Sequence, residues 1–250
     1  MMIFVFAGPS VFAGDAELYP RITFLPPVSL GDVYRLLNQK PKAIGIIDGY
    51  FERSPAVSHK EILLALSSGV HVFGAASMGA LRAAELAPFG MVGIGKIFES
   101  YRDGLIEDDD EVAVAHGPQA EGYRMASEPM VNIRATVERA LRERILTRPA
   151  ADHVLSAAKS LYYPLRNYPA ILEGAQISEK TGARFLQWLV NGKVDQKRED
   201  AQALLALLTS GRTARLGRKR VSFPFHRTQM WDFAMQNVKG EHGSTIHPRG

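Results

Sequence analysis

The sequence contains no cysteine, which excludes disulfide bonds, thiolate metal sites and a cysteine nucleophile. Long apolar runs are also missing, since Gly, Pro or charged residues interrupt every apolar stretch well before the ~20 residues that span a bilayer. Residues 1–18 hold an apolar segment without a preceding positive region, so we interpret them as a buried first strand rather than a signal peptide. We therefore expect a cytoplasmic globular protein that makes no membrane contact.

A net positive charge is absent from most of the chain and is concentrated at its end. Residues 211–250 hold eight Lys or Arg side chains and two acidic ones, whereas the whole chain has a net charge of only +4. The cluster GRTARLGRKR at 211–220 is suited to contact RNA, an acidic partner or only water. Because no basic stripe with interleaved aromatic residues occurs elsewhere, we do not expect specific nucleic-acid recognition.

The periodicity of the apolar residues changes near residue 128. Before it, short apolar stretches alternate with amphipathic ones, which predicts an α/β fold with a mainly parallel sheet and helical crossovers. After it, helical spacing predicts an all-helical part. We expect an α/β core at 1–128, a helical region at 129–210 and a partly disordered basic tail at 211–250. Strands are expected within 3–8, 22–25, 43–48 and 70–75, and helices within 29–39, 57–69, 78–86, 130–146, 151–163, 180–192 and 196–211.

Three loops that follow expected strands carry residues suited to chemistry. They are Gly8-Pro9-Ser10, Asp48-Gly49-Tyr50 and Ala76-Ser77-Met78-Gly79. The carboxyl ends of parallel strands meet at one edge of a sheet, where ligands usually bind, so we expect these loops to share a site. Ser10 is a reserve nucleophile. Asp48 and Gly49 either orient a substrate or a base, or simply end a strand.

The segment HVFGAASMGALRAAEL, residues 71–86, sets Ser77 between an apolar strand and a helical run. Small residues two positions to either side, Ala75 and Gly79, resemble those of a nucleophile elbow, in which a serine occupies a sharp strand-to-helix turn. We predict that Ser77 is a nearly unshielded nucleophile, with the backbone N–H groups of Met78 and Gly79 available to hold an oxyanion. The alternative is an ordinary N-cap serine among tightly packed small residues.

A serine nucleophile requires a base, and no Asp-to-His order of a hydrolase triad follows Ser77. Ser58 and Glu61 fit a capping box, which places Lys60 in the first turn of a helix, at the positive end of its dipole. That position and partial burial favour a neutral lysine able to deprotonate Ser77, as in Ser-Lys hydrolases. A charged surface lysine is the alternative. The weaker candidates for this base are His59, His71 and His116.

Two further charged features each have a functional and a structural interpretation. Arg82 lies just beyond Ser77 and is suited either to bind a substrate carboxylate or to pair with Glu85. The acidic run EDDDEVAVAH, residues 107–116, is either a site for a hard cation such as magnesium, or a solvated loop or landing site for a basic partner. Because consecutive aspartates seldom all point at one ion, we expect no metal, and nothing in the sequence predicts a cofactor.

Five blocks follow one another within about residues 3–120: FVFAGPS, IGIIDGYF, SHKEILLAL, GVHVFGAASMGALRAAEL and GMVGIGKIFESYRDGLIEDDDEVAVAHG. Together they resemble the core of the TfuA-like family, the partners of YcaO proteins in modified-peptide pathways. The resemblance is specific over the expected α/β core and weaker over the helical region and the basic tail.

This resemblance implies a role in YcaO-dependent thioamidation of a peptide backbone, in which sulfur replaces an amide oxygen. It implies hydrolysis of the C-terminal thiocarboxylate of a ThiS-like sulfur carrier, and a stronger association of YcaO with its peptide or protein substrate. It further implies a Ser-Lys hydrolase-like site, which we map onto Ser77 and Lys60. The alternatives are a non-catalytic adaptor for YcaO and the carrier, and a general serine hydrolase of small esters or amides.

Overall fold

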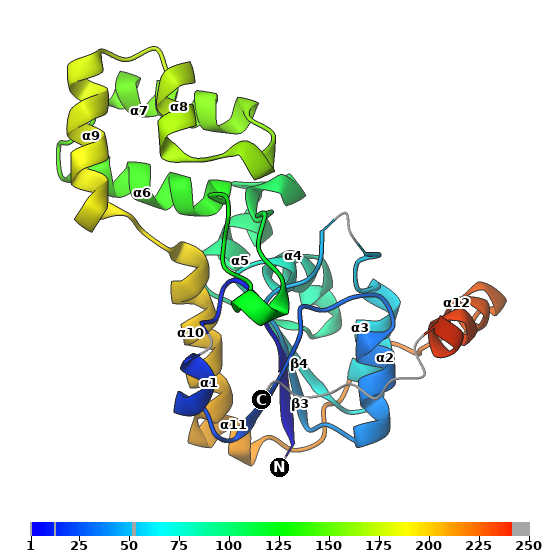
Figure 1. The fold of residues 1–250 in the computed structure, drawn as a ribbon. Coiled ribbons are helices and arrows are strands. Elements are labelled where there is room, and N and C mark those ends of the chain that lie inside the picture. The colour runs from blue at the N-terminus through cyan, green and yellow to red at the C-terminus, as the bar shows by residue number, and fades with distance from the viewer. Residues whose placement is uncertain (1, 13, 52–53, 242–250) are drawn as a thin grey trace. The chain divides into compact units, whose positions relative to one another are not determined.

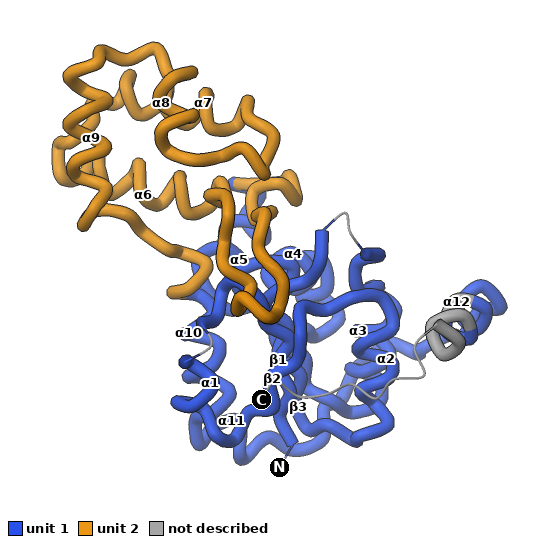
Figure 2. The backbone as a smooth tube through the Cα atoms, viewed as in Figure 1, with its two compact units in different colours: residues 1–105, 200–250 blue, residues 106–199 orange. Residues whose placement is uncertain are grey.

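The computed structural model describes residues 2–12, 14–51 and 54–241 of the chain (Figure 1). The chain forms two compact units, with residues 1–105 and 200–250 in unit 1 and residues 106–199 in unit 2 (Figure 2). These bounds differ from the three regions expected from the sequence. The last helix of the expected helical region and the basic tail both return to unit 1, because their apolar side chains pack there rather than on the other helices.

Unit 1 is built around a parallel sheet of five strands in the order β2-β1-β3-β4-β5. The strands are β1 (Ile3–Phe6), β2 (Ile22–Leu25), β3 (Ala43–Ile46), β4 (His71–Ala75) and β5 (Val92–Ile94). The helices of its first segment are α1 (Asp15–Leu18), α2 (Asp32–Leu36), α3 (His59–Ser67), α4 (Met78–Leu86) and α5 (Lys96–Arg102), with short 3-10 turns η1 (Leu37–Gln39) and η2 (Ala87–Phe89). The expected α/β class with a mainly parallel sheet is confirmed.

Helices cover both faces of this sheet, with α1, α10 (Gln196–Thr209) and α11 (Gly211–Arg215) on one side and α2 and α3 on the other (Figure 1). Leu204 and Leu208 of α10 are buried against the inward side chains of β1 and β2. Gly45 in β3 makes room for them, since a Cβ there would lie 3.0 Å from Leu208 Cδ1. Spacing alone predicted this helix, but not that its apolar face would pack on the sheet.

Some elements of unit 1 were not predicted. The fifth strand, β5, has only three residues, and with Gly93 at its centre it gives a weak strand pattern. The short helix α1 and the helix α5 that follows β5 were also missed.

Unit 2 is helical and has its own core. Ile133, Val137, Val154, Ile171 and Phe185 are among the fully buried side chains of that core. Its helices are α6 (Met130–Arg142), α7 (Arg148–Ser160), α8 (Tyr168–Gly174) and α9 (Glu179–Gly192), with 3-10 turns η3 (Asp109–Glu111), η4 (Gln119–Glu121) and η5 (Tyr163–Leu165). The expected helical part is thus confirmed, with α8 as an additional helix.

The end of the chain contains structure that its weak periodicity did not predict. Besides α11, residues 211–241 form the helix α12 (Gln229–Glu241), which lies beside α2 and α3 (Figure 1). Trp231 and Met235 of α12 are buried in a small cluster with Tyr34, Leu64 and Phe225. The described part of this tail therefore contains ordered structure, because these side chains find an apolar surface on unit 1. Residues 242–250, the HGSTIHPRG segment, lie outside the described residues.

Candidate functional site

The sheet topology brings the three predicted loops to one edge. In the order β2-β1-β3-β4-β5, β1 and β4 both pair with β3, and all of these strands are parallel. The loops after β1, β3 and β4 therefore follow adjacent strand ends. The connections change direction between β1 and β3, and such a switch point is where ligands bind in open α/β sheets.

Asp48 joins the loops after β1 and β3 at this switch point. Its side chain is 1% exposed, and Oδ2 accepts hydrogen bonds from the Gly8 N–H (2.8 Å) and the Ser10 N–H (3.0 Å). The Ser10 hydroxyl donates to Asp48 Oδ1 at 2.7 Å. The sequence offered Asp48 and Ser10 as separate candidates, and the structure makes them one hydrogen-bonded group.

Ser77 follows a strained turn at the end of β4. The Ser77 N–H donates to the Ala75 carbonyl at 2.7 Å, which closes a three-residue turn around Ala76. Ala76 has φ +66°, the rare and strained form of this turn for a residue with a Cβ. Ser77 is the N-cap residue of α4, although its side chain makes no capping hydrogen bond. The strand-to-helix turn is as predicted, but the strained residue is Ala76, one position before the serine.

The prediction that Ser77 is unshielded is wrong, because the residue is only 2% exposed. The small residues around it serve close packing of the backbone. A Cβ on Gly79 would lie 1.7 Å from the Ile46 carbonyl oxygen, and one on Gly74 would lie 2.0 Å from the Gly79 oxygen. The start of α4 thus rests directly on β3 and β4, and this contact buries the serine.

The backbone donors near Ser77 differ from those predicted. The Gly79 N–H donates to the Ile47 carbonyl at 3.2 Å, so it already has an acceptor and does not fit the predicted oxyanion site. Met78 is the first residue of α4, where the helix itself offers no acceptor for an N–H group. A Cβ on Gly49 would lie 2.9 Å from the Met78 side chain, so the loops after β3 and β4 are in close contact.

Lys60 lies where the sequence placed it, in the first turn of α3. Ser58 caps this helix and accepts from the Lys60 N–H (3.2 Å), while Glu61 completes the predicted capping box by accepting from the Ser58 N–H (3.1 Å). Glu61 is fully buried, and burial raises the pKa of its carboxyl. The Lys60 ammonium donates to Thr228 Oγ1 at 2.9 Å. Its partnership with Ser77 stays a prediction.

Arg82 takes the structural role that the sequence had offered as the alternative to substrate binding. Its guanidinium pairs with Glu85 at 2.8 Å, and its Nε donates to the Val57 carbonyl at 3.2 Å. Glu85 Oε2 also lies 2.7 Å from His59 Nε2, within hydrogen-bond distance. Because its guanidinium already binds Glu85 and the Val57 carbonyl, Arg82 is poorly placed to neutralise a substrate anion.

The two remaining histidine candidates contact backbone carbonyls. In unit 1, His71 Nε2 lies 2.9 Å from the Gly217 oxygen. In unit 2, His116 Nδ1 lies 2.8 Å from the Gly117 oxygen, and its ring meets that of Tyr123 edge-on. Each contact fits a structural role better than that of a base for Ser77.

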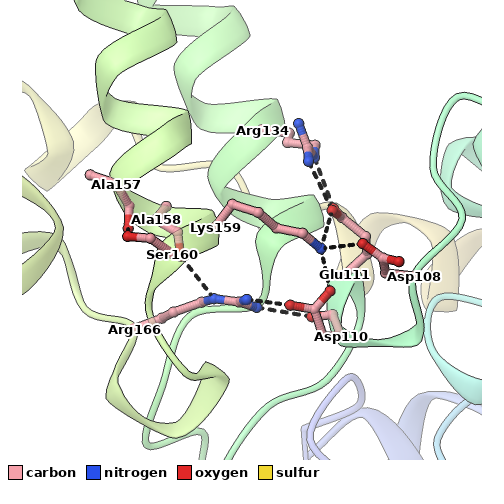
Figure 3. A network of polar contacts seen from close by, with 9 residues as sticks. All are labelled: Asp108, Asp110, Glu111, Arg134, Ala157, Ala158, Lys159, Ser160 and Arg166. Atoms are coloured by element: carbon pink, nitrogen blue, oxygen red, sulfur yellow. Dashed lines mark hydrogen bonds and ion pairs between the residues drawn. The ribbon is translucent and has the colours of Figure 1, made fainter.

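The acidic run is the centre of an ion-pair network in unit 2 (Figure 3). Lys159 pairs with Asp108, Asp110 and Glu111. The neighbouring arginines complete the network, since Arg134 binds both carboxylate oxygens of Glu111 at 2.8 Å and the buried Arg166 pairs with Asp110. Oxygens of the three carboxylates lie close enough to bind a metal together, yet basic side chains already occupy them. The run is thus divided, with Glu107, Asp108 and Asp109 exposed and Asp110 and Glu111 held in the network.

These contacts also set the protonation of the network. Burial raises the pKa of Asp110, but the hydrogen bonds and charges of Lys159 and Arg166 outweigh it and hold the pKa below its ordinary value. Glu111 behaves in the same way, because Arg134 and Lys159 outweigh its burial and lower its pKa. Both carboxylates are therefore ionised at neutral pH, as the network requires.

The described part of the chain contains no helix that is both long enough and apolar enough to cross a bilayer.

Comparison with known proteins identifies the family. No curated protein shows significant similarity to the chain. The family model described as TfuA-like protein matches residues 48–167, a range that begins at Asp48 and includes Lys60 and Ser77. This family is generally linked to YcaO-associated thioamidation. The match supports the resemblance seen in the sequence blocks, although it begins after the block FVFAGPS and extends into the helical region, and residues 48–167 are thus identified as TfuA-like.

Proposed function

We propose that the protein assists a YcaO enzyme in peptide backbone thioamidation by hydrolysing the C-terminal thiocarboxylate of a ThiS-like sulfur carrier, with Ser77 as the nucleophile. The observation that carries this proposal is the strained turn at Ala76, immediately before Ser77. Strain of this kind persists only where the surrounding structure enforces it, and it clusters at active sites. The turn lies at the carboxyl edge of the sheet, beside the Asp48 group, within the region that the family match covers.

The proposed chemistry combines the predicted Ser77–Lys60 pair with the backbone groups at the start of α4. In the proposed reaction neutral Lys60 takes the proton of the Ser77 hydroxyl, and the oxygen attacks the thiocarboxylate carbon. The positive end of α4 and the Met78 N–H stabilise the tetrahedral oxyanion. The carbon–sulfur bond then breaks as the Lys60 ammonium returns the proton to the sulfur, and hydrosulfide leaves. Water attacks the resulting ester, and the carrier is released with an ordinary carboxylate.

A buried serine requires that the surrounding loops open for the carrier tail. In this proposal the loops after β1 and β3 move apart to admit the C-terminal tail of the carrier. Asp48 holds these two loops together, which makes it a positioning residue for the site. The thiocarboxylate is anionic, and since Arg82 is engaged elsewhere, the dipole of α4 is the main source of attraction.

The burial of Ser77 favours a second candidate function, that of a non-catalytic adaptor. Here the protein binds YcaO and the carrier, and the Ala-Gly-Ser turn serves packing alone. The two candidates differ in whether the Ser77 hydroxyl is needed once the fold is intact.

The decisive experiment measures sulfide released from a thiocarboxylated ThiS-like carrier. We expect Ser77→Ala to lower the release rate by at least about a hundredfold, because the covalent route is lost. Ser100→Ala is a matched control, since that hydroxyl donates only to the Lys96 carbonyl within α5 in the hydrogen bonds described, and it should leave the rate unchanged. If Ser77→Ala retains full sulfide release, Ser77 is not the nucleophile. If wild type releases no sulfide while Ser77→Ala keeps thioamidation and YcaO binding, the adaptor function replaces the hydrolase.

A further inference from the structure

Residues 225–231 contact Lys60, the side chain that the proposed reaction uses as a base. Lys60 Nζ donates to Thr228 Oγ1 at 2.9 Å. The same ammonium lies 5.8 Å from the ring centroid of Phe225 and 5.7 Å from that of Trp231, within the range of cation–π attraction. Three residues within a seven-residue segment thus surround one amine.

This segment is anchored independently of Lys60. Trp231 is only 5% exposed, and its ring meets those of Tyr34 and Phe225 edge-on at 5.8 Å. The backbone N–H of Trp231 donates to Thr228 Oγ1 at 3.2 Å. The hydroxyl that accepts from Lys60 therefore also caps the start of α12. The contact with Lys60 is therefore coupled to the position of α12 on unit 1.

The chemistry of this contact favours one protonation state. Aromatic ring faces attract a cation and not a neutral amine, and a hydroxyl oxygen that already accepts from a backbone N–H binds an ammonium more strongly than an amine. A general base for Ser77 must instead be neutral with a lone pair directed at the hydroxyl. The two roles of Lys60 are thus mutually exclusive.

We propose that residues 225–231 form an inhibitory clamp, which holds Lys60 as an ammonium ion and prevents it from activating Ser77 until α12 is displaced. This inference rests on the proposed function. It assigns the end of the chain a regulatory role, in which the catalytic state requires the clamp to open.

The first test measures sulfide release by the full chain with the clamp weakened. Thr228→Val removes the acceptor at nearly constant volume, and Phe225→Leu removes one ring face. We expect each variant to release sulfide roughly five- to tenfold faster than wild type, the size of effect typical of one hydrogen bond or cation–π contact. Met230→Ala is the control, because Met230 is a 77% exposed neighbour on α12 that does not contact Lys60 in the contacts described, and it should not change the rate.

The second test does not depend on hydrolysis. An amine-reactive ester acylates only neutral amines, and mass spectrometry of peptides gives the rate at Lys60. We expect faster acylation of Lys60 in Thr228→Val and Phe225→Leu than in wild type or Met230→Ala. If acylation rises but no sulfide release depends on Ser77, the contact of residues 225–231 with the Lys60 ammonium stands, while the proposed hydrolase and the inhibitory role of that contact both fail. If neither rate rises while Ser77→Ala abolishes release, the hydrolase stands and the clamp is refuted.

Discussion

The two units hold their carboxylates in different ways. In unit 1, Asp48 accepts hydrogen bonds from two backbone N–H groups and the Ser10 hydroxyl, in the loops at the carboxyl edge of the sheet. In unit 2, Asp110 and Glu111 pair with the cationic side chains of Lys159, Arg134 and Arg166. The first arrangement fixes the backbone of two loops, and the second neutralises charge between helices and a turn.

This difference shows that the density of acidic residues is a poor guide to the site. The run at 107–111 is the most conspicuous charged feature of the sequence, yet its contacts are those of a structural network. The single Asp48, which the sequence could equally assign to the end of a strand, lies at the switch point of the sheet and beside the loop of Ser77. We infer that the position of a charge in the topology says more about function than its abundance.

The largest expected loss of stability follows from a substitution at the Ser77 turn of unit 1. It tests whether the backbone packs more closely there than in the helices of unit 2. Gly79→Ala places a methyl group against the Ile46 carbonyl, and since neither backbone can yield easily, we expect the free energy of unfolding to fall by about 3 kcal/mol or more. Denaturant unfolding and hydrogen exchange of the α4 and β4 amides measure this loss.

The matched control is Gly182→Ala on α9 of unit 2. A Cβ there meets only Ile177 Cδ1, at 3.9 Å, so we expect no loss and a gain of up to about 1 kcal/mol from better helix propensity. A comparable loss in both variants would contradict the special packing assigned to the turn.

A smaller loss of stability is expected for Asp48→Asn. The amide offers one acceptor oxygen where the carboxylate offers two, and its NH2 group would face the Ser10 hydroxyl or a backbone N–H, so we expect a loss of about 2 kcal/mol. Denaturant unfolding measures the loss, and sulfide release should fall with it. Asp152→Asn, at an exposed position of α7, should change neither quantity. Unaltered stability in Asp48→Asn would mean that the carboxylate does not hold the two loops.

The smallest effect concerns the network of unit 2. Lys159→Met leaves Asp110 and Glu111 with one cationic partner each, and because the site is partly solvated we expect a loss of only about 1 kcal/mol at neutral pH. Hydrogen exchange of the α6 and α7 amides measures it. Lys180→Met, at an exposed position of α9, is the control.

The same variant also tests the pH dependence. Asp110 and Glu111 have pKa values below those of the unfolded chain, so they contribute stability that is fully present above about pH 5 and is lost as the pH falls through the folded-state values. Lys159→Met moves both pKa values back toward the ordinary range. The loss of stability on acidification should therefore be smaller in this variant, and an unchanged acid dependence would rule out Lys159 as a cause of the lowered pKa values.

Much of the fold was predictable because local patterns decide it. Alternation of short apolar stretches with amphipathic ones gave four of the five strands, and the capping box at Ser58 and Glu61 located the start of α3. The strand β5 has only three residues with a glycine at its centre, so its apolar pattern is too weak to predict a strand. The pairing of Arg82 with Glu85, one turn apart on α4, was likewise within reach of helix spacing.

The sequence by itself determined which residues form the strands, the helices and the loops of the candidate site, since these depend on spacing along the chain. Only the tertiary structure decided that Ser77 is buried, that Asp48 binds Ser10, and that Lys60 meets Thr228, 168 positions later. Such contacts depend on which surfaces come together, and a side chain's chemistry is compatible with many partners. For the same reason a basic tail without periodicity could fold back onto unit 1, where buried apolar side chains hold α12 in place.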